Sequence, residues 1–272
     1  TSGGRLRPNT LRRDSTGSRH FLNRRNERMR MRVACVALAC LFLVPRLNAE
    51  DANPRWKQVI GLQTKRENET KFASGFLVKK GDDVFLVTAK HASRETNGNT
   101  RLLYVTPEGE SRWYLMRGLF SAGKDPWTEH GHADVAIAKL SPPQQTEETL
   151  KVMRNVAIDF QTIAKVIPGR TTPIELVGFP MALGVGPKMS ALVIPGHVVS
   201  KELTKQGDWG TTPIVYAVPA VGAGASGSPA YDVSVNPAVV IGVYVAVTKD
   251  ITGAKLSEFV PSRLVREIIE AW

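Results

Sequence analysis

Cysteine is scarce in this 272-residue chain, and a hydrophobic segment long enough to cross a membrane is missing. The two cysteines, Cys35 and Cys40, lie in one apolar run, so the rest of the chain cannot build a disulfide framework. That run, Val33 to Pro45, has 13 residues, whereas a membrane-spanning helix needs roughly 20. With 42% hydrophobic and 22% charged residues the composition is globular, which excludes a wholly disordered or collagen-like chain.

The positive charge of the chain is confined to its N-terminus. The formal net charge is +11, which by itself suggests a nucleic-acid-binding protein. However, the first 49 residues contain 11 arginines and only two acidic residues, whereas residues 50–272 carry a net charge of +2. We therefore expect no nucleic-acid partner for the body of the chain.

The charged N-terminus has the pattern of a secretory leader. Residues 24–32 (RRNERMRMR) are basic, the short apolar run follows, and Ala49 ends a typical cleavage site. We predict cleavage after Ala49, a secreted or periplasmic location and no stable membrane anchor, with residues 1–28 as an upstream extension. Three alternatives are weaker. A mitochondrial transit peptide would not contain the uninterrupted apolar run, and a nucleic-acid-binding arm would interleave aromatic residues. Lipid attachment at Cys40 would leave the apolar residues LFLVP in the mature chain.

Residues 50–272 have the pattern of an all-β domain. Two apolar runs, Ser74–Val78 and Val84–Thr88, flank a polar segment that contains Gly81, which predicts a hairpin. Similar runs recur about every ten residues between turn residues, at Leu102–Val105, Trp113–Leu115, Val135–Leu140, Ile174–Val177, Ala191–Val199, Pro213–Ala217 and Val239–Val247. A helical period is expected only at the end, where Leu264, Val265, Ile268 and Ile269 form one apolar stripe.

Three short motifs contain residue types that serve nucleophilic catalysis. VTAKH ends at His91, HADVAIA contains Asp134, and GAGASGSPA contains Ser226. Each motif alone is weak, since a lone His or Asp at a strand end, or a Ser between glycines, is usually structural. Their weight comes from the order His, Asp, Ser in an all-β chain, with separations of 43 and 92 residues.

On these motifs the sequence resembles the trypsin/chymotrypsin-like serine peptidases. TAKH resembles the family's T-A-A-H, GASGSP resembles G-D-S-G-G-P, and the segments SGFLV and VGFP resemble exported bacterial members, including the HtrA type. The resemblance implies two antiparallel six-stranded β-barrels and a short C-terminal helix. We expect barrels at about 54–145 and 171–258, a linker at about 146–170 and a helix at 262–272, with no PDZ-like domain after Trp272.

The resemblance also implies a mechanism for a serine endopeptidase acting on polypeptides without cofactor or metal. Ser226 would be the nucleophile, His91 its base and Asp134 the group that orients the imidazole. The backbone N–H groups of Gly224 and Ser226 would form the oxyanion hole. Ala225 replaces the Asp that animal members use for zymogen activation, so that ion pair is not expected. Lys90 beside His91 is expected to face solvent.

The specificity pocket implied by the resemblance is apolar. Its expected lining contains no carboxylate, which disfavours cleavage after Arg or Lys and favours a small or medium apolar side chain. The lining residues are Ala220, Val221, Val245, Ala246 and Val247.

Other functions stay open as alternatives. The chain could be a catalytically silent two-barrel binding module, or a nucleic-acid binder with salt-sensitive affinity. His130-Gly131-His132 has the spacing of a metal site but lacks an evident third ligand, so we interpret it as a surface loop. His197 is interpreted as a strand residue and Asp82-Asp83 as a turn.

Overall fold

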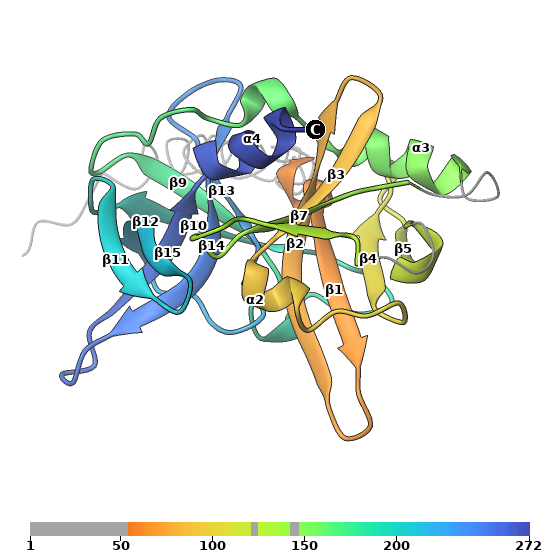
Figure 1. Cartoon of the computed structure of the whole chain (residues 1–272), viewed down its shortest axis with the longest axis horizontal. Helices are drawn as coiled ribbons and strands as arrows, with labels where there is room; N and C mark the ends of the chain where they lie inside the picture. The colour runs from red at the N-terminus through yellow and green to blue at the C-terminus, as the bar shows by residue number, and fades with distance from the viewer. Residues whose placement is uncertain (1–53, 121–124, 142–146) are drawn as a thin grey trace, which may run out of the picture. The chain divides into compact units, whose positions relative to one another are not determined.

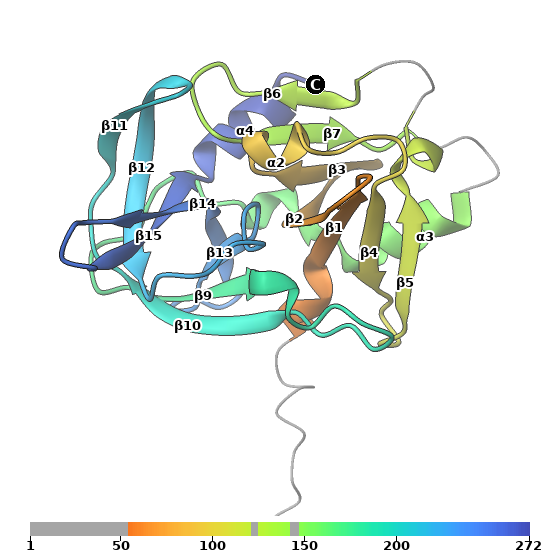
Figure 2. The ribbon, with the colours of Figure 1, turned by 90° about the horizontal axis from the view of Figure 1, so that it is seen from below.

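Two largely antiparallel β-sheets form the framework of the computed structural model, which describes residues 54–120, 125–141 and 147–272 (Figure 1). The predicted leader, with Cys35, Cys40 and the cleavage site at Ala49, lies outside the described residues. Figures 1 and 2 show the two sheets side by side. The all-β prediction is confirmed. In the described ranges, no helix is long and apolar enough to cross a membrane.

The first sheet has the strand order β5-β4-β1-β2-β3-β7-β6, and β8 pairs with β2 in parallel. Among the described residues, no pairing joins its end strands β5 and β6, so this sheet is not a closed barrel. Its strands are β1 (Val59–Lys65), β2 (Thr70–Lys80), β3 (Asp83–Thr88), β4 (Arg101–Val105), β5 (Ser111–Leu115), β6 (Trp127–Glu129), β7 (Ala136–Lys139) and β8 (Ile158–Asp159).

The second sheet has the order β10-β9-β13-β14-β15-β12-β11 and comes nearer to closure. Strand β10 also pairs with β12 through His197↔Val218 and Val198↔Ala217, which places His197 in a strand as predicted. The sheets thus have eight and seven strands instead of six each. The second contains β9 (Pro173–Gly178), β10 (Leu192–Val198), β11 (Leu203–Gly207), β12 (Gly210–Val218), β13 (Pro229–Asp232), β14 (Val239–Lys249) and β15 (Lys255–Pro261).

The predicted hairpin is formed by β2 and β3, with Gly81 in the turn at a φ of 59°. Side chains alternate across a strand, so these two strands send neighbouring residues into different cores. Phe76 and Phe85 pack between the sheets, whereas Leu77 and Leu86 pack inside the first sheet. Because both faces are buried, the sequence shows continuous apolar runs here instead of alternation.

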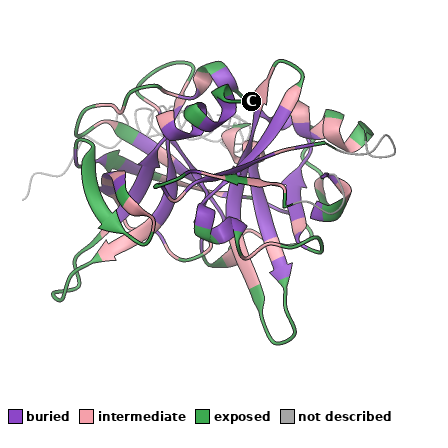
Figure 3. Ribbon diagram, in the orientation of Figure 1, coloured by how far each residue is buried: buried purple, intermediate pink, exposed green. Residues whose placement is uncertain are grey.

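Three hydrophobic cores hold the described residues together. One lies inside each sheet, and the third joins the two sheets through Phe76, Val177 and Val243. Figure 3 shows the buried strands in purple, while the tips of the β1–β2 and β14–β15 hairpins are exposed. The C-terminal helix α4 (Arg263–Glu270) is confirmed, and its apolar stripe packs into the core between the sheets.

A second long helix, α3 (Glu147–Val156), corrects the sequence analysis, which expected no helical period before the C-terminus. Glu147 and Glu148 lie in its first turn, where negative charge stabilises a helix. Met153 and Val156 are buried against the first sheet. The stripe is sparse and follows a polar Pro-Pro segment, so it does not stand out in the sequence. The remaining helical turns are η1 (Pro54–Gln58), α2 (Lys90–Ser93), η2 (Met116–Gly118), η4 (Phe160–Thr162) and η5 (Pro180–Ala182).

Candidate active site

His91 lies in the short helix α2, directly after strand β3. The turn is closed by local bonds: the Ser93 amide donates to Ala89 O at 2.9 Å, and the Ser93 hydroxyl donates to Lys90 O at 2.8 Å. The side chain of His91 is 43% exposed, so the sheet presents its imidazole at the surface. The imidazole is therefore accessible from solution.

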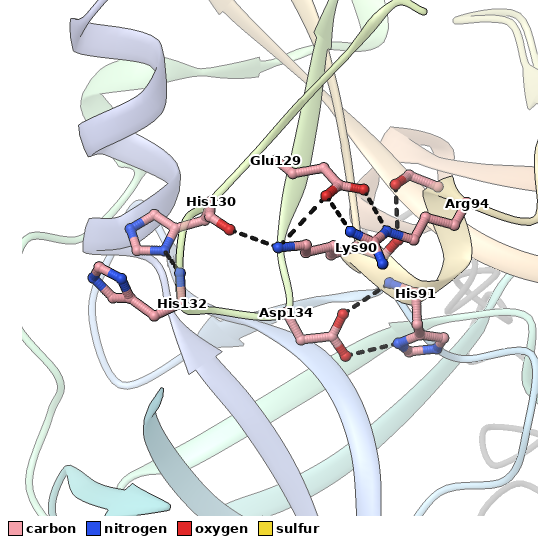
Figure 4. A network of polar contacts seen from close by, with 8 residues as sticks. Lys90, His91, Arg94, Glu129, His130, His132 and Asp134 are labelled. Carbon is pink, nitrogen blue, oxygen red and sulfur yellow. Dashed lines mark hydrogen bonds and ion pairs between the residues drawn. The ribbon is translucent and has the colours of Figure 1, made fainter. Parts of the chain in front are cut away.

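Asp134 contacts His91 at two points (Figure 4). Its Oδ1 accepts from the His91 backbone N–H at 2.9 Å, and its Oδ2 lies 2.7 Å from His91 Nδ1. The Asp134 side chain is only 16% exposed. This arrangement favours the tautomer with the proton on Nδ1, which leaves Nε2 free to accept a proton. The structure therefore brings two of the three predicted residues into direct contact.

Lys90 corrects the expectation that it faces solvent, because only 5% of it is exposed. Its Nζ donates to His130 O at 2.9 Å and lies 3.5 Å from Glu129 Oε2. It also lies 4.5 Å from the ring centre of Trp209, a cation–π contact. Lys90 thus ties the helix that carries His91 to the loop that carries Asp134.

Arg94 strengthens the same connection from the helix end. Its guanidinium donates two hydrogen bonds of 2.7 Å to the carboxylate of Glu129 (Figure 4). The guanidinium also lies 4.4 Å from the ring centre of Trp209. The bond from Arg94 lowers the pKa of Glu129, so this carboxylate stays ionised at neutral pH. Trp209 comes from the turn between β11 and β12, and Thr212 of β12 donates to His132 O. Both sheets therefore hold the His91–Asp134 pair in place.

His130 and His132 stack edge to face with ring centres 4.9 Å apart. Nε2 of His130 faces Glu267 of α4 at 3.5 Å. Burial lowers the pKa of His130, which favours its neutral form at neutral pH. In the ranges that the structure describes, no three His, Cys, Asp or Glu side chains are grouped as metal ligands. His130 is therefore buried against α4, whereas His132 is exposed on the same loop.

Ser226 lies on the loop between β12 and β13, partly exposed. Its carbonyl accepts from the Ser74 N–H at 2.8 Å, and the next residue, Gly227, packs against Ser74 and Thr88. A Cβ atom at Gly227 would come within 2.3 Å of Thr88 Oγ1, and its φ of 91° also favours glycine. Since Thr88 lies three residues before His91, the loop abuts the His91 segment. No hydrogen bond joins the Ser226 hydroxyl to His91 within the described residues.

Some amides of this loop are hydrogen-bonded within the described part of the protein and others are not. Ala225, Gly227 and Ser228 donate to carbonyls within the protein. The N–H groups of Gly224 and Ser226, the two predicted oxyanion donors, have no acceptor among the described residues. Gly224 has a φ of 91°, a conformation that L-residues rarely adopt.

One of the predicted pocket residues, Val221, lies beside Tyr244, a side chain that the sequence did not single out. The hydroxyl of Tyr244 donates to Val221 O at 2.6 Å, and its ring packs edge to face on Phe259. Only 2% of Tyr244 is exposed, and burial raises its pKa to about 12. Val245 joins the core between the sheets, whereas Ala220, Ala246 and Val247 are half-buried. The phenol therefore fills space beside Val221.

Sequence comparisons find no family model and no curated protein that match this chain. Solved structures do match. The MamO protease domain from Magnetospirillum magneticum has a TM-score of 0.53 at 15% identity, covering 80% of this chain and 98% of that one. A form of the HtrA-type protease AlgW with a tripeptide has a TM-score of 0.53 at 14% identity, covering 82% of this chain and 62% of that one.

The scabies mite inactivated protease paralogue S-I1 has a TM-score of 0.54 at 16% identity, covering 81% of this chain and 97% of that one. The fold thus occurs in proteases and in an inactivated paralogue, so the fold does not distinguish an active protease from an inactive one. At these identities the likeness shows the fold: the chain has the two-sheet β fold of the HtrA-type and trypsin-like serine proteases.

Proposed function

We propose that this chain is an exported serine endopeptidase with the triad His91, Asp134 and Ser226. The observation that carries the proposal is the pair of hydrogen bonds between His91 and Asp134, with a separation of 2.7 Å between Nδ1 and Oδ2. A carboxylate in that position holds the imidazole in the tautomer that a base needs. The protease fold of the neighbouring structures supports the same function.

In the acylation step, His91 Nε2 takes the proton of the Ser226 hydroxyl as Oγ forms a bond to the substrate carbonyl carbon. The carbonyl electron pair moves to oxygen, which the free N–H groups of Gly224 and Ser226 would stabilise. When the C–N bond breaks, the imidazolium returns the proton to the leaving amine. A water molecule then releases the acyl group by the same steps in reverse, and no cofactor takes part.

The wild-type protein tests this function directly. We expect it to cleave an unfolded polypeptide at pH 8 and to be inhibited by a serine-reactive sulfonyl fluoride. EDTA should leave the rate unchanged, because none of these steps uses a metal ion. The alternative is a silent binding module, which the missing Ser226–His91 hydrogen bond favours. Binding of the unfolded polypeptide without cleavage would support that alternative and contradict the proposal.

The proposal includes the leader and the domain boundaries. We propose that residues 1–49 direct export and that residues 50–272 form the peptidase domain. The mature chain should then start at Glu50, and N-terminal sequencing of the exported protein measures that directly. A first residue still within 1–49 would contradict cleavage after Ala49.

A further inference from the structure

We propose that Ser74 is a positioning residue that sets the conformation of the oxyanion loop; this inference rests on the proposed function. Ser74 lies in β2 of the first sheet, 150 residues before Gly224, and is completely buried. It makes four hydrogen bonds, two of them directly to the loop that carries Ser226. No other part of the proposed mechanism uses this side chain.

Two bonds from Ser74 fix two peptide groups of the loop. Its hydroxyl donates to Gly224 O at 2.8 Å, and its N–H donates to Ser226 O at 2.8 Å. In a trans peptide the C=O and the following N–H point in opposite directions. These bonds therefore also direct the N–H groups of Ala225 and Gly227 toward Gly222 O and Tyr244 O, where both are found. The peptide between them, which contains the Ser226 N–H, is held on both sides.

The peptide before Gly224 is held by a turn that Ser74 also supports. The Met181 N–H donates to Ala223 O at 2.5 Å, which directs the Gly224 N–H away from that turn. Met181 and Ala182 have φ values of 55° and 56°, unusual for residues with side chains. The turn begins at Phe179, whose N–H donates to Ser74 Oγ at 3.0 Å. One hydroxyl thus links the turn and the loop.

The backbone of Ser74 is itself fixed to the segment that carries His91. The Thr88 hydroxyl donates to Ser74 O at 2.7 Å, three residues before His91. Ser74 is therefore placed to keep the nucleophile loop of one sheet in register with the base of the other. Removing the Ser74 hydroxyl should therefore make the peptide groups around Gly224 more mobile. It should leave substrate contacts intact, because Ser74 is completely buried.

The test variant is Ser74→Ala, and Ser262→Ala is its matched control. Ser262 lies at the start of α4 and is 1% exposed. Its hydroxyl likewise donates to a backbone carbonyl, Ala164 O, at 2.8 Å. Ser74→Ala removes the two buried hydrogen bonds of the Ser74 hydroxyl and Ser262→Ala removes one, so both variants should have lower thermal stability. Ser74→Thr keeps the hydroxyl and serves as the rescue variant.

We expect Ser74→Ala to lower kcat about 10-fold with KM nearly unchanged, less than the loss of an oxyanion donor itself. The affinity for a peptide boronic acid, whose tetrahedral adduct uses the oxyanion donors, should fall by a similar factor. Ser262→Ala should change neither quantity, and Ser74→Thr should restore most of kcat. Equal kcat losses in Ser74→Ala and Ser262→Ala, or no loss in either, would overturn the positioning role.

A measurement independent of turnover separates this inference from the proposed function. Amide hydrogen exchange of residues 222–228 should be faster in Ser74→Ala than in wild type or Ser262→Ala. An inactive wild type with this exchange pattern would refute the peptidase but retain the structural effect of Ser74. An active wild type with unchanged exchange and kcat in Ser74→Ala would refute the inference alone.

Discussion

Replacing Asp134 with Asn should lower kcat about 10⁴-fold near pH 7 and leave KM almost unchanged. In the structure both carboxylate oxygens accept hydrogen bonds from His91. An amide offers one acceptor oxygen and one donor nitrogen, so it cannot accept both bonds. Where the NH₂ group faces Nδ1, the imidazole places its own proton on Nε2 and cannot take one from Ser226. Steady-state kinetics on a peptide substrate measures this change.

Asp83→Asn is the matched control for that variant. Asp83 is ion-paired with Lys139 at 2.8 Å and is the first residue of β3, outside the candidate site. It loses the same charge as Asp134→Asn, so a non-specific charge effect would appear in both variants. We expect its kcat to match that of the wild type. An Asp134→Asn variant within tenfold of wild-type kcat would contradict the assigned role.

If the chain is the proposed peptidase, replacing Tyr244 with Ala should change the side chain after which it cleaves. The phenol fills the space beside Val221, so the wild type should cleave after small residues such as Gly, Ala and Ser. Truncation opens an apolar cavity between Val221 and Phe259. The preference for Phe or Leu over Ala should then rise at least about 100-fold, since each methylene group that a hydrophobic pocket accepts is worth about 10–200-fold in specificity. Mass spectrometry of a digested peptide library measures the preference.

Tyr244→Phe is the control, because it keeps the ring and removes only the hydrogen bond to Val221 O. Its cleavage preference should remain that of the wild type. Truncating a buried aromatic residue lowers the free energy of unfolding by about 3–5 kcal/mol and leaves a cavity. The molecule p-cresol has the shape of the removed side chain, so its binding to this cavity provides a second readout. It should raise the Tm of Tyr244→Ala and leave that of the wild type unchanged. Efficient wild-type cleavage after Phe, or an unchanged preference in Tyr244→Ala, would refute this assignment of the pocket.

The local pattern of the sequence predicts the elements in which apolar residues are densely and regularly spaced. The β2–β3 hairpin follows from two apolar runs around Gly81, and α4 follows from its dense apolar stripe. Helix α3 escapes prediction because its buried face is sparse and its stability comes from packing on the first sheet. Propensity and periodicity do not report such tertiary support.

The candidate site shows the same division. His91, Asp134 and Ser226 are predicted from their motifs, and the structure joins the first two by hydrogen bonds. The residues around them depend on contacts between distant segments. Ser74 contacts Gly224 from 150 positions away, and Trp209, from a hairpin of the other sheet, lies over Lys90. No local signal in the sequence encodes either contact.

Covalent labelling at Ser226 tests the central claim most directly. A fluorophosphonate probe reacts with a serine that a neighbouring base activates, and intact-mass analysis with peptide mapping locates the adduct. The proposed triad predicts one adduct per wild-type chain, on Ser226, slower labelling in Asp134→Asn and none in Ser226→Ala. A folded wild-type protein that forms no adduct, or a Ser226→Ala variant labelled as readily as the wild type, would contradict the proposed enzyme.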